Sequence, residues 1–395
     1  MKILVASCQF PYSEVPHAGG ETVYHIIESL SKKHEIHLLS LINEGERIHL
    51  DEIKLICKKV DVVARSSAPW KKYYNALRML VISTRFVGHS SWYEFQQQSN
   101  LILSSNHYDV VLIEFTETAM FFPSFKKYPT VIDIIDVISK SPERQQLYRK
   151  SGVFFGSNDS ILQQEILLYQ QADRLIVKSG SEKRFLMERS KEFHIDVIPP
   201  WVRLGRFNEI KENNNGKELL FVGALDREAN SEAISFFCTE VFPNIRALIP
   251  EVNLTIVGGG ASSKIERLAS IPGVRITGYV PRVEPYYEKA TVFVAPLKVG
   301  GGIIVKILDA MAAGKPVVTT SAGNEGIEAV PDKEILIADS AQEFAMKVTD
   351  LLLNQDVRER ISREAKTFVE KHFSWDNNMS RLEDILEECV KNVRK

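Results

Sequence analysis

The stretch VGGGIIVKILDAMAAGKPVV (299–318) contains the residues whose types and spacing are best suited to hold an anion. A glycine run that enters a helix lets backbone N–H groups approach a phosphate, and the helix N-terminus favours negative charge. Lys306 falls near the start of the expected helix, where a cation is unfavourable for the helix itself, and Asp309 follows on nearly the same face. The spacing leaves two interpretations open. The pair either binds a phosphate and a ribose hydroxyl or forms a surface ion pair after a flexible loop.

Two other glycine clusters follow apolar runs, HAGGETVY (17–24) and TIVGGGASSKIERL (255–268). Neither has the GxGxxG spacing, so neither predicts a nicotinamide site. The first would lie at the carboxyl end of a strand, where ligands meet loops, and a plain tight turn explains it equally well. For the second we favour a structural turn.

Short apolar runs alternate with helical patterns along most of the chain, and these are the elements that must position the candidate residues. Runs such as KILVAS, EIHLLSLI and YDVVLIEF are continuous, as in parallel strands covered on both faces. A proline-containing and polar break at 199–217 separates two such series. We therefore expect an α/β protein with two doubly wound domains, 1–199 and 200–372, followed by a terminal helix at 373–395.

The composition excludes several classes of protein. With 395 residues, 44% of them hydrophobic, and a formal net charge of −2, the chain is not expected to bind nucleic acid. Four scattered cysteines without a CxxC pair, and the lack of an Asp-X-Asp triplet, give no metal signature and fit a cytoplasmic protein. The basic and aromatic segment 69–86 is either a core-packing helix with a solvated basic face, which we favour, or a contact with anionic lipid.

The second half of the chain resembles a known family. The order FVGALDREAN, LTIVGGG, VRITGYVPRVEPYYEKATVFVAPL and GGGIIVKILDAMAAGKPVVTTSAGNEGI resembles the C-terminal domain of the family-four (group 1) glycosyltransferases. Upstream, ADRLIVKSGSEKRFL before HIDVIPPWVRLGRF is similar to the family's approach to its linker, and HAGGETVYHIIESLSKKHEIHLL to its first loop and helix. The resemblance implies a GT-B fold, with two Rossmann-like domains facing an interdomain cleft and the terminal helix returning to the first.

The resemblance also implies an activity. A retaining hexosyl-type glycosyltransferase would move a sugar from a nucleotide-diphosphate donor to a hydroxyl of a glycan or lipid-linked acceptor, in cell-surface polysaccharide or glycolipid synthesis. Such an enzyme needs no cofactor and no metal, and it would work in the cytoplasm, with peripheral contact at the inner face of the plasma membrane through 69–86. Two alternatives stay open: a GT-B-fold nucleotide-sugar epimerase and a non-catalytic sugar-nucleotide-binding relative.

Residue by residue, the resemblance implies roles at matching positions. Lys306 and Arg227 would stabilise the leaving diphosphate, and Asp309 would bind the ribose. Asp136 would orient the acceptor or the sugar, although a plain strand-end aspartate explains it equally well, and for Glu325 a turn carboxylate is an equally good explanation. The expected donor-binding residues are Gly20, Gly223, Lys298, Gly301, Gly302, Ile303, Lys306, Asp309 and Glu325.

The sequence departs from the family at several of these positions. Gly301 stands where the family often has the first of two glutamates, and Asp309 stands at the second. Ile135 occupies the place of a histidine that is common at the end of a first-domain strand. Gly223-Ala224-Leu225 replaces a Gly-Arg-Leu that grips the pyrophosphate, so Arg227, Lys298 and Lys306 are the available substitutes.

Overall fold

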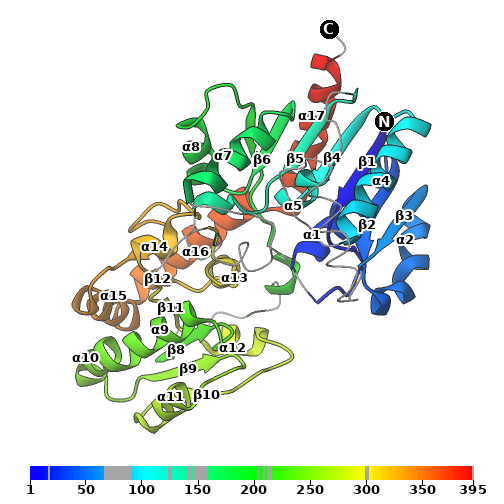
Figure 1. The fold of residues 1–395 in the computed structure, drawn as a ribbon. Helices are drawn as coiled ribbons and strands as arrows, with labels where there is room; N and C mark the ends of the chain where they lie inside the picture. Colours follow the sequence, from blue (N-terminus) through cyan, green and yellow to red (C-terminus); the bar gives the residue numbers. More distant parts are fainter. Residues whose placement is uncertain are drawn as a thin grey trace. The chain divides into compact units, whose positions relative to one another are not determined.

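The computed structural model describes the chain except for residues 17, 66–89, 123–126, 141–144, 146–157, 203, 208–209, 211–215, 299–301 and 394–395. The chain divides into two compact units, Met1–Ile198 with Met379–Lys395 and Pro199–Asn378. Each unit contains a sheet of parallel strands with helices packed on it (Figure 1). The expected α/β class is confirmed.

The first unit has a seven-stranded sheet in the order β3-β2-β1-β4-β5-β6-β7. Its strands are β1 Lys2–Ser7, β2 Glu35–Ile42, β3 Lys59–Ala64, β4 Val110–Glu114, β5 Thr130–Asp133, β6 Arg174–Val177 and β7 Ile195–Val197. Its helices are α1 Ala18–Ser31, α2 Leu50–Ile56, α4 Ser90–Ser105, α5 Thr116–Met120, α7 Asn158–Tyr169 and α8 Gly180–Met187, with 3₁₀ turns η1 Glu44–His49 and η3 Ile138–Lys140. Every residue of β4 is buried, as a strand covered on both faces requires.

Helix α17, Trp375–Val393, begins in the second unit and ends in the first. Within the first unit, Glu383 accepts hydrogen bonds from Lys33 at 2.7 Å and His34 at 3.0 Å. Leu382 and Leu386 are buried on the same helix. The two polar contacts fix α17 to the end of α1, and the apolar face supplies the burial that holds it there.

The second unit has a six-stranded sheet in the order β10-β9-β8-β11-β12-β13. Its strands are β8 Glu218–Val222, β9 Asn253–Val257, β10 Val274–Ile276, β11 Val292–Ala295, β12 Val317–Thr319 and β13 Leu336–Ile337. Its helices are α9 Glu228–Phe236, α10 Phe242–Leu248, α11 Ser263–Glu266, α12 Glu284–Lys289, α13 Val305–Ala312, α14 Ser321–Asn324, α15 Ala341–Leu353 and α16 Gln355–His372, with the shorter turns η4 Leu204–Phe207, η5 Phe237–Val241 and η6 Arg267–Ser270.

Alternate residues of β8 enter two separate cores. Leu219 and Phe221 join the cluster that includes α10 and α15, whereas Leu220 joins the cluster that includes α12, α13 and α16. Successive side chains of a strand point to opposite faces, so this sheet is covered by helices on both. A π-helical turn at η5 separates α9 from α10, and Pro243 lies in the first turn of α10, where proline is tolerated.

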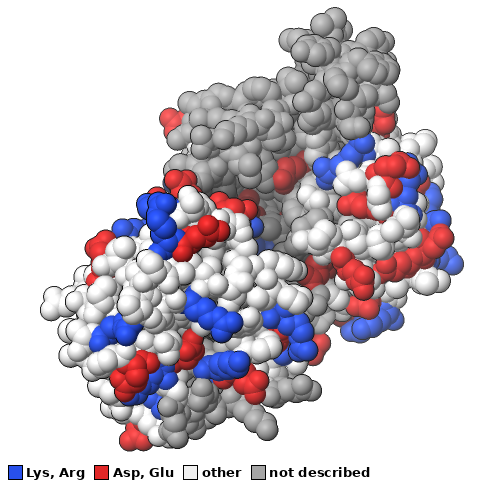
Figure 2. All heavy atoms as spheres, turned by 90° about the horizontal axis from the view of Figure 1, so that it is seen from below, with Lys and Arg blue, Asp and Glu red and all other residues white. Residues whose placement is uncertain are grey.

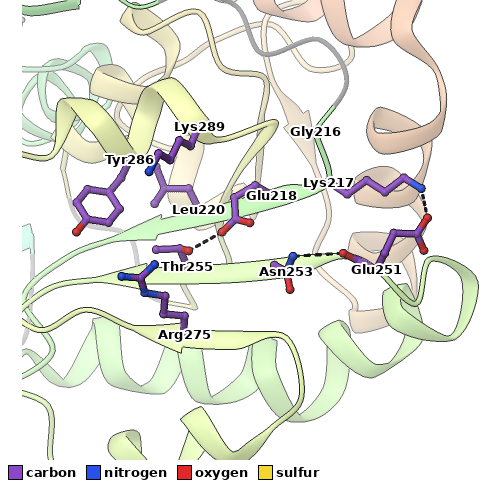
Figure 3. A pocket seen from close by; sticks show the side chains of 10 residues that line it. All are labelled: Gly216, Lys217, Glu218, Leu220, Glu251, Asn253, Thr255, Arg275, Tyr286 and Lys289. Atoms are coloured by element: carbon purple, nitrogen blue, oxygen red, sulfur yellow. Dashed lines mark hydrogen bonds and ion pairs between the residues drawn. The ribbon is translucent and has the colours of Figure 1, made fainter.

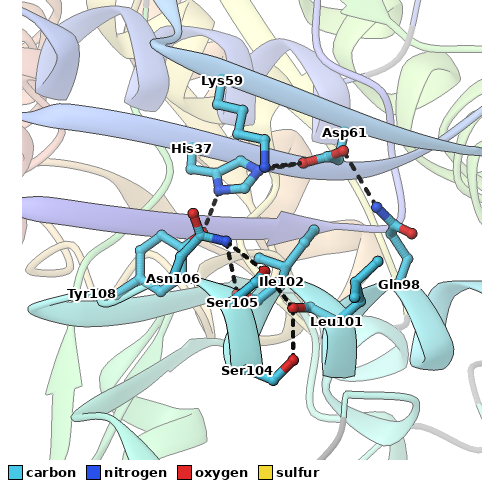
Figure 4. A network of polar contacts seen from close by, with 10 residues as sticks. All are labelled: His37, Lys59, Asp61, Gln98, Leu101, Ile102, Ser104, Ser105, Asn106 and Tyr108. Atoms are coloured by element: carbon cyan, nitrogen blue, oxygen red, sulfur yellow. Dashed lines mark hydrogen bonds and ion pairs between the residues drawn. The ribbon is translucent and has the colours of Figure 1, made fainter.

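A buried polar network ties the amino ends of the first unit's strands together (Figure 4). His37 on β2 is 2% exposed, and its Nδ1 is hydrogen-bonded to the Tyr108 hydroxyl. Its Nε2 lies 2.6 Å from Asp61 Oδ2 on β3, and Gln98 on α4 donates to Asp61 Oδ1 at 3.3 Å. Burial lowers the pKa of His37, against the opposing effect of Asp61. The folded chain therefore favours the neutral ring more than the unfolded chain does.

Among the described residues, no helix is long and apolar enough to cross a membrane. The segment 69–86, for which the sequence left a contact with anionic lipid open, lies outside the described residues.

Candidate functional site

The strand order of the second unit indicates where a ligand would bind. The chain starts at β8, adds strands on one side to β10, and then crosses to β11 on the other side. In open parallel sheets, ligands bind outside the carboxyl ends of the strands at such a reversal. Gly223 directly follows β8, and α13 follows β11. The topology therefore brings Gly223 and Lys306 to the same edge.

The side chain of Lys306 is held over the loop after β8. It comes from the first turn of α13, and its Nζ donates a hydrogen bond of 2.5 Å to Asn230 Oδ1. The same ammonium lies 4.6 Å from the centre of the Phe221 ring. Burial, and then the charge of Arg227, lowers the pKa of Lys306 to about 8. Because the amide partner is neutral, it leaves the positive charge available to an anion.

Gly223 makes this placement of the ammonium possible. A Cβ atom at residue 223 would lie 2.7 Å from Lys306 Nζ and 2.9 Å from Asn230 Nδ2. Asn230 is itself fixed, since its Nδ2 donates to the Ala224 carbonyl at 2.8 Å. The glycine is thus required by the approach of the two side chains.

The three glycines at 258–260 let the loop after β9 pack on the loop after β8. A Cβ atom on Gly258 would lie 1.8 Å from the Gly223 carbonyl oxygen. Gly260 has φ +77°, and a Cβ atom there would lie 2.8 Å from Asp226 Cβ. These contacts support the structural turn that the sequence favoured.

Asp309 lies three residues after Lys306 on α13 and is half-buried, as Lys306 is. Burial raises its pKa to about 6, although the Arg206 guanidinium opposes this effect. Arg206 forms an ion pair with Glu284 at the start of α12. The buried Tyr287 hydroxyl donates to the Lys306 carbonyl at 3.4 Å. Asp309 therefore remains mainly ionised at pH 7, beside one cation and one further carboxylate.

The segment before α13 is packed against the segment after α14. A Cβ atom on Gly326 would lie 2.6 Å from the carbonyl carbon and oxygen of Gly302 and 2.8 Å from the nitrogen of Ile303. Gly302 and Ile303 are half-buried there, whereas Glu325 is exposed. The structure thus brings Gly302 and Ile303 next to the turn that carries Glu325.

Lys298 and Arg227, two other predicted residues, lie at opposite ends of α9. The Lys298 ammonium lies 4.5 Å from the centre of the Phe236 ring, at the end of α9, whereas Lys306 contacts Asn230 in the first turns of that helix. Arg227 is exposed at the N-cap of α9 and acts on Lys306 through its charge. Gly301 lies outside the described residues.

The two predicted residues of the first unit follow the carboxyl ends of its strands. Gly20 is buried in the first turn of α1, so the glycine pair begins the helix rather than forming a loop before it. A Cβ atom on Gly19 would lie 3.0 Å from the Phe115 ring, which explains a glycine inside a helix. Asp136 is half-buried between β5 and η3.

A hollow of about 360 Å³ lies elsewhere on the second unit (Figure 3). Tyr286 and Lys289 project into it from α12, and Arg275 lies on β10. Its other lining residues are Gly216, Lys217, Glu218, Leu220, Glu251, Asn253 and Thr255. None of the predicted site residues lines it, so this hollow is separate from the candidate site.

The described surface shows no built metal centre. Within the described residues, no three His, Cys, Asp or Glu side chains gather as a metal site would require. On the face shown in Figure 2, basic and acidic side chains are interspersed.

Known proteins resemble the second unit at the level of a family model and nearly the whole chain at the level of relatives and structures. Residues 216–354 match the family model described as "Glycosyl transferases group 1". An uncharacterized 44.6 kDa protein in the cps region of Klebsiella pneumoniae is 24% identical over 399 residues, which cover 94% of this chain and 96% of that protein. The sucrose-phosphate synthase structure from Thermosynechococcus elongatus has a TM-score of 0.69 and 14% identity, covering 99% of this chain and 100% of that one. Anabaena HepE in complex with UDP and glucose has a TM-score of 0.65 and 14% identity, covering 97% and 99%.

Two parallel α/β sheets that follow these structures over nearly their whole length define the GT-B fold. Within this fold, residues 216–354 of the second unit match the group 1 glycosyltransferase model, and this match supports glycosyltransferase activity. The fold expected from the sequence is confirmed, and the match of residues 216–354 supports the expected resemblance of the second unit to the family.

Sequence reasoning missed four residues that surround Lys306 and Asp309. These residues are Arg206, Asn230, Glu284 and Tyr287. They come from the linker turn η4 and from α9 and α12, and no local spacing connects them to α13. All four lie in stretches that carried the resemblance, but nothing in those stretches singled them out. Asn230 lies in FVGALDREAN, Glu284 and Tyr287 lie in VRITGYVPRVEPYYEKATVFVAPL, and Arg206 lies in HIDVIPPWVRLGRF.

Proposed function

We propose that the protein transfers a hexose from a nucleoside-diphosphate sugar to a hydroxyl of a glycan or lipid-linked acceptor, with retention at the anomeric carbon. Cell-surface polysaccharide or glycolipid synthesis at the cytoplasmic side of the membrane is the process we assign to it. The observation that carries the proposal is the Lys306 ammonium, held by a neutral amide against Gly223 at the reversal of strand order. The relatives agree in kind: the Anabaena structure contains UDP and glucose, and the Klebsiella protein is described as lying in a cps region.

The proposed chemistry needs stabilisation of a diphosphate whose charge grows as it leaves. A preorganised cation in a site with little water stabilises such charge more than it would in bulk solvent. Lys306 supplies that cation, and the exposed Arg227 supplies a second positive charge. Backbone N–H groups at the start of α13 add favourable electrostatics for the diphosphate. This arrangement performs the transfer without a metal or cofactor.

The remaining residues bind the rest of the donor and the acceptor. Asp309 accepts hydrogen bonds from the ribose hydroxyls, for which an ionised carboxylate is suited. Gly302 and Ile303 shape the floor of the site beside Glu325, and Lys298 guides the anionic donor. Gly20 serves the donor phosphate or the acceptor side, Asp136 serves the acceptor, and residues 69–86 provide the membrane contact.

A thermal-shift screen tests the donor site. UDP, GDP, ADP and their common sugar conjugates are added one at a time to the wild-type protein and to Lys306→Ala. We expect one base to raise the melting temperature of the wild type, with its diphosphate form losing most of the shift in the variant. The absence of a shift with every nucleotide, or an equal shift in both proteins, would overturn the site. Conversion of a nucleotide sugar into its epimer without a glycoside product would identify an epimerase instead.

A further inference from the structure

A row of polar side chains ends three neighbouring strands of the first unit. Ser7 on β1, Glu114 on β4 and Asp133 on β5 are register partners in parallel pairs. Partners in register point to the same face of the sheet. Glu114 and Asp133 are 0% and 2% exposed, and Lys178 follows β6 beside them. The edge thus buries two carboxyl groups against one lysine.

Lys178 is engaged by Asp133. Lys178 Nζ lies 2.5 Å from Asp133 Oδ1 and 2.7 Å from Oδ2. Both carboxyl oxygens of Glu114 are buried and have no hydrogen-bond partner among the described residues. An ionised carboxylate in such a position is costly, so the group is more stable as a neutral acid. Burial, followed by the charge of Asp133, raises the pKa of Glu114 well above its ordinary value, against the opposing effect of Lys178.

The backbone is strained immediately after this carboxyl group. Phe115 has φ +72°, which is unfavourable for a residue other than glycine, and its ring packs on Gly19 at the start of α1. Strain of this kind persists only where the surroundings fix it, and it clusters at functional sites. Glu114 is therefore the residue that directly precedes the ring against which Gly19 packs.

The loop that carries Asp136 is held at each end by buried polar contacts. It begins directly after Asp133, and its η3 turn donates two backbone hydrogen bonds of 2.8 Å to Glu165 on α7. Tyr169 donates to Glu165 at 3.0 Å and lies 2.9 Å from Thr116 Oγ1, which belongs to the segment after Phe115. The loops that follow β4 and β5 are thus connected through buried polar groups.

We propose that Glu114 is a positioning residue for acceptor use: its bound proton preserves the Asp133–Lys178 pair and thereby holds the loop that carries Asp136. This inference rests on the proposed function, because it takes Asp136 to serve the acceptor. When Glu114 ionises, a second carboxylate competes for Lys178 and the loop loses one of its anchors. Acceptor use falls as the pH rises, and donor binding in the second unit does not.

Other ionisable groups face the same edge. Cys8 follows β1, and burial raises its pKa to about 12, so it stays a thiol. Glu117 on α5 and Arg65 act on Cys8 through their charges. Burial also raises the pKa of Glu165, which keeps its own donors. Comparison of the wild type with Glu114→Gln isolates Glu114 from all of them, because the amide has the same shape and stays neutral at every pH.

The first arm of the experiment needs no substrate. Infrared difference spectra of the wild type minus Glu114→Gln are recorded at neutral pH, with Glu117→Gln as the matched control at the same edge. We expect a protonated-carboxyl band that is lost in Glu114→Gln and kept in Glu117→Gln. A wild-type spectrum without that band would show that Glu114 is ionised, and it would overturn the proposal.

The second arm measures steady-state transfer against pH. Above the pKa of Glu114 we expect the acceptor KM of the wild type to rise by up to about tenfold per pH unit, as one proton is lost. The acceptor KM of Glu114→Gln stays constant with pH. The donor KM changes with pH in the same way in both proteins. An equal alkaline rise of the acceptor KM in both proteins would overturn the positioning role. A wild type that transfers no sugar to any acceptor would overturn the proposed function and this role together. The infrared band would still show whether Glu114 is protonated.

Discussion

Gly223→Ala tests the donor site through a single methyl group. The new Cβ would lie 2.7 Å from Lys306 Nζ and 2.9 Å from Asn230 Nδ2, so both side chains must move away. Both atoms belong to side chains rather than to the backbone, so the change disturbs the hydrogen bonds of Lys306 and Asn230 and leaves the surrounding backbone in place. The cost falls on the ligand, because the ammonium leaves the position in which it faces the phosphate.

The magnitude follows from the bond that is lost. A hydrogen bond to a charged group contributes about 1.5–3 kcal/mol, which corresponds to a roughly ten- to hundredfold weaker Kd for UDP. Uridine has no phosphate, so its affinity changes little. Calorimetric titration of both ligands into both proteins measures the difference, and the melting temperature checks the fold.

Gly45→Ala is the matched control, since a Cβ atom there meets no other atom within 4 Å. We expect it to bind UDP as the wild type does. If Gly223→Ala keeps the wild-type affinity for UDP, or loses equal affinity for UDP and uridine, the argument that places the phosphate at Lys306 is refuted.

Three further predictions follow from the titrating groups. Because the pKa of Lys306 is about 8, its charged fraction falls about tenfold between pH 7 and pH 9, and we expect the UDP affinity measured by calorimetry to fall with it while uridine binding stays level. Asp309→Ala should weaken UDP by roughly tenfold or more, without an equal loss for 2′,3′-dideoxy-UDP, and equal losses would contradict the ribose role. The pKa of His37 is lowered in the folded chain, so the unfolded chain binds more protons below its ordinary value of about 6.5 and stability is lost as the pH falls through that range. Urea unfolding at pH 7 and pH 5 measures this loss, and His37→Gln should reduce it; parallel curves for the two proteins would count against it.

Much of the fold was predictable because its signals are local. The continuous apolar runs became buried parallel strands, such as β1 and β4, since a strand covered on both faces has no polar side. A helix was expected to begin near Lys306, and α13 spans Val305–Ala312. The first glycine pair was harder to interpret, because its place inside α1 depends on the ring of Phe115, which lies far along the chain.

The surroundings of the site were predictable only in part. Lys306 and Asp309 could be singled out because they share one helix face and follow a glycine run. Their partners could not be found in this way, because Asn230 is 76 residues from Lys306 in the sequence and the two meet only when α9 and α13 pack on one sheet. The pKa values of about 8 and about 6 likewise arise from burial, which no spacing encodes.

The central claim is that the protein moves a sugar from a nucleoside diphosphate to an acceptor with retention, through the site at Lys306. NMR spectroscopy of the reaction, with the donor chosen by the thermal-shift screen, tests it most directly. We expect a new glycoside whose anomeric configuration matches that of the donor, one nucleoside diphosphate released per bond formed, and loss of both products in Lys306→Ala. An inverted glycoside, or a product that forms equally well in Lys306→Ala, would contradict the account.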